Sequence, residues 1–262
     1  MAVIDLSFTL SDLEFFLLIF VRITCFIYAC PNMSNGNVPN QYKIALGFFL
    51  SFLTYSFVEP TSLVSYSSVM EYAVIVAKEA VVGLCIGLAA TICTNIVTFA
   101  GRIMDTEMGL SMATVYDPTT RENVSLSGTF YNYLVTIILM ISGMYRYLMS
   151  AIIETFELIP VNGENIAMGK LLNSFVGFMS DFFSVGFKIC LPVFAAIMLL
   201  NAVLGILAKV SPQLNMFAVG HQLKILTGLA IMFLTINVLP AVSDYIYSEM
   251  KKTVVSFVEA MM

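Results

Sequence analysis

Charge is scarce in this chain: Lys, Arg, Asp and Glu together make up only 11% of its 262 residues. A soluble domain carries about 25% charged residues, and hydrophobic residues here reach 59%, so a soluble globular protein is excluded. The few basic residues form no patch, which excludes nucleic acid as a partner. Because no polar block is long enough to form a soluble domain, we expect a membrane protein that crosses the bilayer several times.

Residues that build active sites are also scarce. The chain has a single histidine, His221, with no partner set around it that would indicate a catalytic triad or a metal site. The five cysteines are odd in number and scattered through apolar stretches, which fits neither a disulfide framework nor a zinc site. The sequence contains no phosphate-binding glycine loop and no His-Glu-x-x-His motif. We therefore expect no enzymatic activity, no metal and no cofactor.

Long hydrophobic segments account for most of the chain and predict an all-α integral membrane protein. The third segment greatly exceeds the roughly 20 residues that a bilayer needs, and the fifth contains Pro192, which is expected to kink it. A polar loop at about 109–125 follows the third segment. The six segments cover about 13–29, 44–58, 69–104, 130–159, 171–208 and 216–246.

Charged residues lie inside several of these segments. Lys78 and Glu79 interrupt the third one, and each charge at a bilayer centre costs about 2.5–3.5 kcal/mol. Roughly eleven Val, Ile and Leu residues between 74 and 97 return about 0.3–0.6 kcal/mol each, so the two sums nearly cancel. We infer that this helix does not face lipid alone: it is covered by protein, or the two charged side chains extend to a nearby membrane interface. Arg22, Lys188 and Lys224 lie in or beside other apolar runs, but the sequence does not assign ion pairs.

One face of the third segment carries small residues with an acidic group at each end. Spacings of three and four place these residues on one side of a helix, where small side chains let two helix backbones approach closely. The pattern predicts a packing face towards another helix, within this chain or in a partner; chance alignment is the alternative. The face consists of Glu79, Gly83, Gly87, Ala90, Thr94, Thr98, Gly101 and Asp105.

The last two hydrophobic segments are separated by a polar break. Pro212 removes a backbone donor, so the helix before it ends or kinks there. Gln213 and Asn215 carry polar groups that lipid cannot satisfy. The break, which Lys224 follows, is therefore expected at a membrane surface or under a cover of protein.

Motifs along most of the chain resemble, in their order and spacing, the FliR family of flagellar type III export-gate proteins, which is related to the SctT group of virulence secretion systems. The chain departs from the family at Ser142–Arg146, where members often have an Asn-Gly-His-His-like turn, and at Gln222, where they often have Pro. The motifs are Arg22, Pro31, Pro39 and Lys43 at the start; Glu79-x-x-x-Gly83-x-x-x-Gly87, Ala100-Gly101-x-x-x-Asp105-x-x-x-Gly109 and Asp117-Pro118 in the middle; and Ser211–Phe217, Gly220, Lys224 and Gly228 at the end.

The resemblance implies an assembly subunit with no chemistry of its own. FliR-like chains form with FliP and FliQ a pore of helices for unfolded flagellar proteins, in the bacterial inner (cell) membrane at the flagellar basal body. FlhB-like and FlhA-like export components are further expected partners. Residues 1–170 are expected to resemble FliP and residues 171–262 the helical hairpin of FliQ.

The resemblance also implies a role for the loop after the third segment. In the family this loop lies within the pore and helps to close it, and here it covers about 109–122. Met108 and Met112 lie four residues apart where the loop begins, although coincidence is the default explanation in a chain with 17 methionines. The expected plug residues are Met108, Gly109, Met112, Asp117 and Pro118.

Two other functional classes compete with this interpretation. Lys78, Glu79 and Lys188 would suit a charged midplane site in a secondary transporter, although we find no convincing internal repeat. A membrane-embedded enzyme is the third class, but the sequence lacks a nucleophile–base pair or metal set for it.

Overall fold

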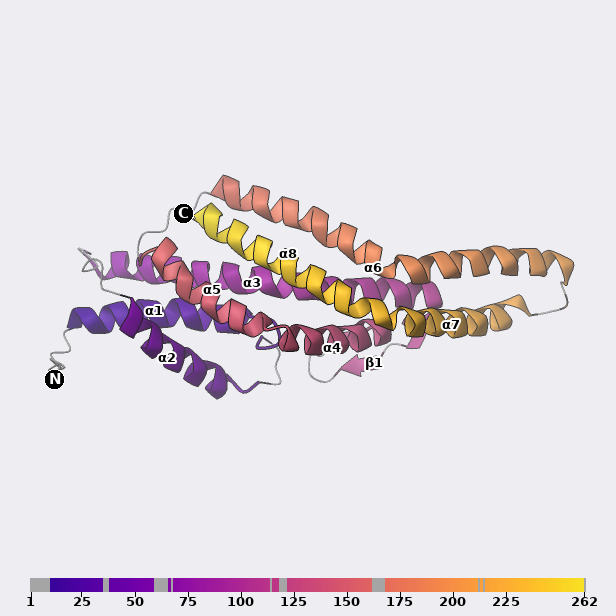
Figure 1. Cartoon of the computed structure of the whole chain (residues 1–262), viewed down its shortest axis with the longest axis horizontal. Helices are drawn as coiled ribbons and strands as arrows, with labels where there is room; N and C mark the ends of the chain where they lie inside the picture. The colour runs from indigo at the N-terminus through magenta and orange to yellow at the C-terminus, as the bar shows by residue number, and fades with distance from the viewer. Residues whose placement is uncertain are drawn as a thin grey trace. The chain divides into compact units, whose positions relative to one another are not determined.

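The computed structural model describes residues 10–34, 38–58, 66, 68–113, 115–117, 122–161, 168–211, 213 and 215–261. Within these ranges the chain forms long helices and one short hairpin (Figure 1), which confirms an all-α membrane protein. The elements are α1 (Leu10–Ala29), α2 (Asn40–Phe57), α3 (Val69–Met108), η1 (Leu110–Ala113), β1 (Val115–Asp117), β2 (Glu122–Val124), α4 (Leu126–Ile141), α5 (Met144–Leu158), α6 (Met168–Val210), α7 (Met216–Thr235), η2 (Ile236–Val238) and α8 (Leu239–Met261).

The six predicted hydrophobic segments correspond to these helices, with two of them divided. The fourth segment forms α4 and α5, which meet at Gly143, and the φ of +82° at this residue is one that favours glycine. The sixth forms α7, the short 3₁₀ turn η2 and α8, and the helix continues beyond the predicted end to Met261. In α6 the helix runs through Pro192.

Three helical stretches of the described chain are long and apolar enough to cross a membrane, namely Val69–Met108, Gly169–Val210 and Ala218–Met261. The bent pair α4–α5 makes a fourth if it counts as one span. The first two predicted segments, α1 and α2, are not among them. Three charged residues lie within α1, and α2 begins with the polar run Asn40-Gln41-Tyr42-Lys43, which lowers its mean hydropathy.

Contacts divide the chain into two compact units. Unit 1 comprises Met1–Thr91, Tyr145–Phe175 and Lys251–Met262, and unit 2 comprises Ile92–Met144 and Val176–Met250. Each unit is assembled from separate segments, so these units do not correspond to a division at residue 170. The assignment of residues 1–170 and 171–262 to FliP-like and FliQ-like parts stays a prediction.

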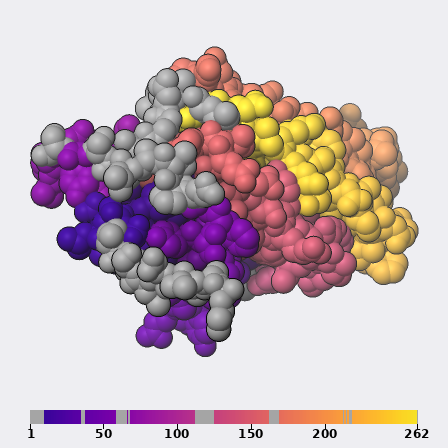
Figure 2. Space-filling view, turned by 60° about the vertical axis from the view of Figure 1, so that its left-hand side comes forward, coloured from indigo at the N-terminus to yellow at the C-terminus, as the bar shows by residue number. Residues whose placement is uncertain are grey.

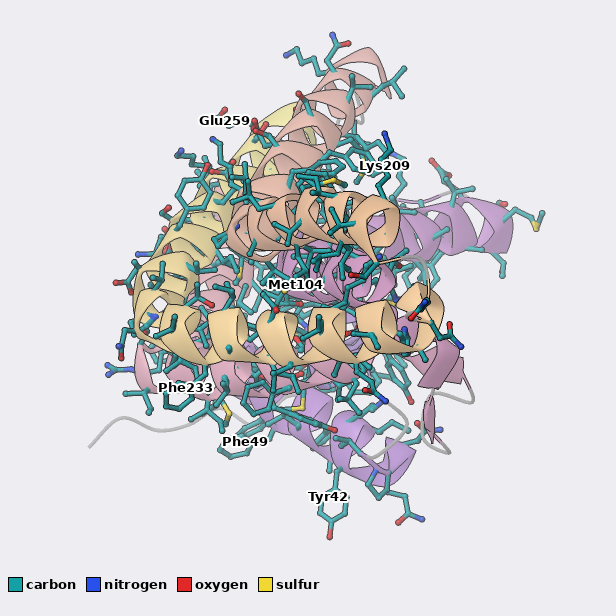
Figure 3. All side chains as sticks on the ribbon, turned by 90° about the vertical axis from the view of Figure 1, so that its right-hand side faces the viewer. Tyr42, Phe49, Met104, Lys209, Phe233 and Glu259 are labelled. Atoms are coloured by element: carbon teal, nitrogen blue, oxygen red, sulfur yellow. The ribbon has the colours of Figure 1, made fainter. Side chains whose placement is uncertain are left out.

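In unit 1, α1 packs against α2 through aromatic side chains. The Phe16 ring lies edge-on to Phe48 and to Tyr55, with centroids 5.6 and 6.1 Å apart. The opposite side of α2 is exposed, and Tyr42 and Phe49 point outward from it (Figure 3). The two helices lie next to each other, in indigo and purple, in the space-filling view (Figure 2).

A tyrosine outside the helices also contacts α1. The Tyr66 hydroxyl donates a hydrogen bond of 2.6 Å to Glu14 Oε1. This bond raises the pKa of Tyr66, because losing the phenolic proton would break the bond and place two negative charges together. The contact ties the segment before α3 to the start of α1.

In unit 2, α3 packs against α6 through an aromatic cluster. The Phe99 ring lies 5.3, 5.4 and 6.0 Å from the ring centroids of Phe182, Phe183 and Phe187. Gly186 makes room for this ring, since a Cβ at this position would be 2.5 Å from Phe99 Cδ1. The buried Met104 lies five residues further along α3 (Figure 3).

The polar loop between α3 and α4 contains secondary structure that the sequence analysis did not predict. After the 3₁₀ turn η1, strands β1 and β2 pair antiparallel, with Val115 opposite Val124 and Asp117 opposite Glu122. Pro118, a predicted plug residue, lies outside the described residues. The described part of this loop therefore contains a short two-stranded hairpin, which follows α3 and η1 and precedes α4 in the chain.

Candidate functional site: a buried ion pair and a clasped loop on α3

The first end of the predicted packing face carries a buried ion pair in unit 1. Arg22 Nε donates a hydrogen bond of 2.5 Å to Glu79 Oε2, and neither side chain is exposed. Burying two ions costs several kcal/mol each, which only close pairing and further hydrogen bonds offset. Both residues are recognisable in the sequence as charges inside apolar segments, but the sequence does not assign them to each other.

The same arginine also contacts the end of α5. Arg22 Nη1 donates to the carbonyl oxygens of Thr155 and Ile159, at 3.3 and 3.0 Å, and the guanidinium lies 4.3 Å from the Phe156 ring centroid. Carbonyl groups at a helix C-terminus lack intrahelical donors and carry partial negative charge. Arg22 therefore joins α1, α3 and the end of α5 around one guanidinium.

The two glycines that follow Glu79 lie directly against the α1 backbone. A Cβ at Gly83 would collide with the Arg22 carbonyl oxygen, and one at Gly87 would be 2.7 Å from the Phe26 carbonyl oxygen. The buried Ala90 continues the face, and the hydroxyl of neighbouring Thr91 donates to the Ala29 carbonyl oxygen. This part of the predicted face therefore packs within the chain, against α1. Its role towards a partner chain stays a prediction.

The second end of the face contacts α4 in unit 2. A Cβ at Gly101 would collide with the backbone of Gly128, and a Cβ at Gly128 would in turn be 3.1 Å from the Thr98 carbonyl oxygen. Thr94 and Thr98 are half-buried between the two ends of the face. Two glycines facing each other allow α3 and the start of α4 to touch through their backbones.

Asp105, at the end of the face, ties both ends of the α3–α4 loop together. Its Oδ2 accepts a 2.6 Å hydrogen bond from the Ser125 hydroxyl. Its two oxygens each lie 3.2 Å from the backbone N–H of Ser127. We call this arrangement of Asp105, Ser125 and Ser127 the Asp105 clasp.

The clasp uses the N-terminus of α4. The first N–H groups of a helix have no intrahelical acceptor, and negative charge is favoured there. Ser125 is the N-cap, with Oγ accepting from the Gly128 N–H at 2.9 Å, while Asp105 accepts from the Ser127 N–H. Two of the free donors of α4 are thereby satisfied, one by the cap and one by the end of α3.

The first two predicted plug residues contact α7. Met108 is fully buried, and its side chain occupies the space that a Cβ would take at Gly228. Gly109 has a φ of +81°, and a Cβ there would be 2.7 Å from the His221 ring. The start of the α3–α4 loop is thus packed on α7, with Met112 in η1 and Asp117 in β1 further along. Whether these residues close a pore stays a prediction.

The predicted C-terminal break forms the turn between α6 and α7. Gln213 is exposed in this turn, and the Asn215 side chain caps α7 by accepting the Ala218 N–H at 3.4 Å. Lys224 is half-buried two turns into α7. Pro212 lies outside the described residues.

The residues of the transporter alternative are not gathered in one unit. Glu79 belongs to unit 1 and is paired with Arg22, whereas Lys188 belongs to unit 2 and lines an apolar cavity. Lys78 is half-buried on α3. Across the described ranges, no three His, Cys, Asp or Glu side chains lie together in a way that would hold a metal ion.

Several contacts that organise this region were not predicted from the sequence. Besides Ser125 and Ser127, the Tyr131 hydroxyl lies 3.0 Å from the Thr235 hydroxyl and joins α4 to the end of α7. A serine directly before an apolar run is an N-cap signal, so the role of Ser125 towards α4 was detectable. Its partner Asp105 was not, because that contact spans the whole loop.

Comparison with known proteins identifies relatives along almost the entire chain. Residues 13–250 match the family described as bacterial export proteins, family 1. Flagellar biosynthetic protein FliR of Bacillus subtilis (strain 168) is 31% identical over 235 residues, covering 89% of this chain and 90% of that protein. FliR of Aquifex aeolicus (strain VF5) is 27% identical over 246 residues, 93% of each chain. FliR of Escherichia coli (strain K12) is 24% identical over 240 residues, 92% of this chain and 91% of that one.

Proposed function

Because the chain belongs to the FliR family of bacterial export proteins, we propose that it is a structural subunit of the flagellar type III protein export gate. In this proposal it forms, with FliP- and FliQ-like chains, the pore through which unfolded flagellar proteins pass. The observation that carries the proposal is the alignment with flagellar biosynthetic proteins over about nine-tenths of both chains.

The placement of the charges and the exposed apolar helices of this chain support a role in assembly rather than in catalysis. Glu79 and Asp105 are held by Arg22 and by the start of α4, so both acidic groups of the packing face serve internal contacts. Large apolar side chains meanwhile stay exposed on α2, α6 and α7. Such surfaces need lipid or partner helices to cover them. The proposed setting is the bacterial inner membrane at the flagellar basal body, with FlhB-like and FlhA-like components as further partners.

Native mass spectrometry of the complex tests this proposal. The chain is tagged in its own host, the membranes are extracted in mild detergent, and the intact assembly is weighed. We expect FliP- and FliQ-like chains at fixed ratios. Recovery of a lone monomer or small homo-oligomer, stable in detergent, would contradict the proposal.

We further propose that the α3–α4 loop closes the resting pore. The Asp105 clasp holds both ends of this loop, and Met108 and Gly109 pack its first residues on α7. A closing element has to be held at its base, and the paired strands β1 and β2 follow this base along the loop.

The secondary transporter is the alternative function, and one observation speaks for it. Lys188 is a charged residue beside a cavity in a helix long enough to span the membrane. Reconstitution of the purified chain alone in liposomes discriminates the two, because a transporter works without partner chains. Substrate-driven transport by the lone chain would favour the transporter.

A further inference from the structure

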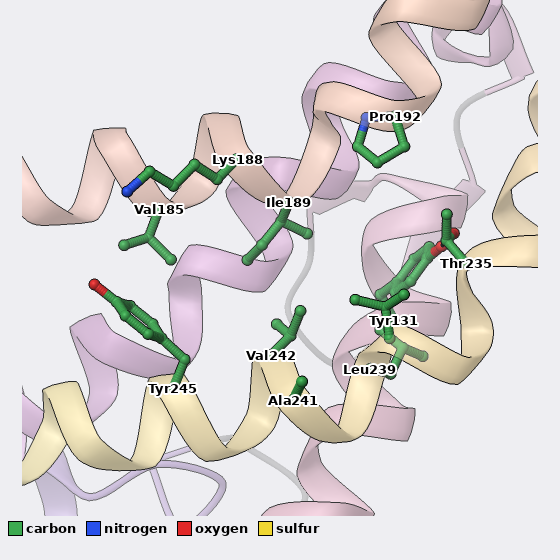
Figure 4. Close-up of a pocket in the computed structure, with 11 residues that line it drawn as sticks. Tyr131, Val185, Lys188, Ile189, Pro192, Thr235, Leu239, Ala241, Val242 and Tyr245 are labelled. Carbon is green, nitrogen blue, oxygen red and sulfur yellow. The ribbon is translucent and has the colours of Figure 1, made fainter.

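A cavity in unit 2 is lined by none of the residues of the clasp or the α3–α4 loop. Its volume is about 270 Å³, and α4, α6, α7, η2 and α8 all contribute to its wall. The lining is mainly apolar and includes Val185, Ile189, Pro192, Leu239 and Val242 (Figure 4).

Polar groups are confined to the two ends of this cavity. At one end the Lys188 ammonium and the Tyr245 hydroxyl point in the same direction (Figure 4). At the other end the Tyr131 and Thr235 hydroxyls lie 3.0 Å apart and satisfy each other. Lys188 is exposed and makes no ion pair within the described residues; Asp244, although next to Tyr245, does not line the cavity. The cavity therefore combines an apolar interior with a positive charge at one mouth.

The position of Lys188 along α6 fits the edge of a bilayer. Between Lys188 and Lys209 the sequence carries no charge, and this run from Ile189 to Ala208 has the roughly 20 residues that cross a hydrocarbon core of about 30 Å. Lysine at the end of such a run extends its ammonium towards the lipid head groups. The cavity then begins at head-group level and continues beside the apolar run.

We propose that this cavity binds one acyl chain of an anionic phospholipid whose phosphate pairs with Lys188 and the Tyr245 hydroxyl. The apolar lining and the charge at one mouth of the cavity favour such a lipid. An acyl chain is slender and apolar, and a phosphate complements the Lys188 ammonium, which forms no ion pair with any residue that the structure describes.

Lipid retention in native mass spectrometry tests the binding. The full chain, in its purified membrane complex, is titrated with phosphatidylglycerol and with phosphatidylcholine. We expect one phosphatidylglycerol to be retained in preference, and Lys188→Gln to lower that preference about fivefold, the effect of one lysine near a lipid surface. Lys188→Arg keeps the charge and should keep the preference. Lys209→Gln, at the other end of the same run, is the matched control and should change nothing.

The outcomes distinguish binding at a specific lipid site from nonspecific attraction of anionic lipid to surface charge. Equal retention of the two lipids by the unmodified chain would overturn the proposal, as would an equal loss in the two Lys→Gln variants. Ala241→Phe, which places a ring in the cavity wall, should reduce the retention of either lipid. Unchanged retention in this variant would mean that the lipid binds elsewhere.

Photo-crosslinking in the native membrane identifies the occupant. A photoreactive phenylalanine derivative at Val242 should give an adduct with the mass of one phospholipid. A polypeptide adduct would overturn the proposal, because a protein segment would then fill the cavity. The crosslinking is measured on the chain in its native membrane and does not require an intact purified export gate, so its failure leaves the proposed function untouched.

Discussion

Arg22 and Glu79 form an ion pair in which neither side chain is exposed. Each charge is therefore stabilised in the interior by the opposite charge beside it. Replacing Arg22 with Met should destabilise the chain by about 3–5 kcal/mol, because Glu79 would lose the guanidinium that offsets the burial of its charge. Changing both residues to Met should recover much of this loss, although the Thr155 and Ile159 carbonyls would still lack the arginine. Thermal unfolding of the purified chain in detergent measures both effects. A double variant as unstable as the single one would contradict the pairing argument.

Asp105 holds the loop through hydrogen bonds to the start of α4. Asp105→Ala should cost about 1–2 kcal/mol locally, in the range of a lost helix cap, and should loosen the base of the α3–α4 loop. Hydrogen exchange at the Ser127 amide and proteolysis within residues 109–122 should both become faster. Asn215→Ala, which removes the cap of α7 instead, is the control and should leave both unchanged. Unchanged exchange in Asp105→Ala would show that the clasp does not hold the loop.

Close approach of α3 to α1 depends on glycine at two adjacent turns. Gly83→Leu should prevent folding of this helix pair, since the added side chain meets backbone atoms of α1 that cannot move aside. Gly177→Leu on α6 is a matched control, because a Cβ at that glycine meets no atom within 4 Å. Membrane insertion of both variants should be normal, because leucine is apolar. The yield of folded chain after detergent extraction measures the difference, and equal yields would contradict close packing at Gly83.

Helix interruptions set the division of this chain into elements. Gly143 and the turn at η2 divide two long hydrophobic segments, whereas Pro192 does not end α6. A hydropathy profile detects each apolar segment, because it averages the hydropathy of the side chains over a window of residues. It does not detect a single backbone break inside the segment, which depends on one residue's φ and ψ.

For the molecule as a whole, the proposed pore closure makes a direct prediction. Deleting residues 110–122 should raise ion leakage through the assembled gate, because the hairpin that we propose closes the pore would be missing. The deletion leaves Asp105, Ser125 and Ser127 in place, so the clasp can still close the shortened loop. Ion flux through the complex in liposomes measures the leak. A Gly-Ser segment of the same length tests whether the native residues, or only the length, matter; an unchanged leak after the deletion would argue against a plug.

Composition and the order of motifs were enough to establish the membrane class, the helical segments and the family, because burial in lipid demands long apolar helices and few charges. The pairing of Arg22 with Glu79, and of Asp105 with Ser125, was decided only by the tertiary structure. These partners lie 57 and 20 residues apart in the chain. The sequence shows which side chains need a partner or a close neighbour. The path of the chain in the fold determines which helix lies next to each of them. A buried charge or a small-residue face fits several helices in principle, and the fold decides which of them pack against it.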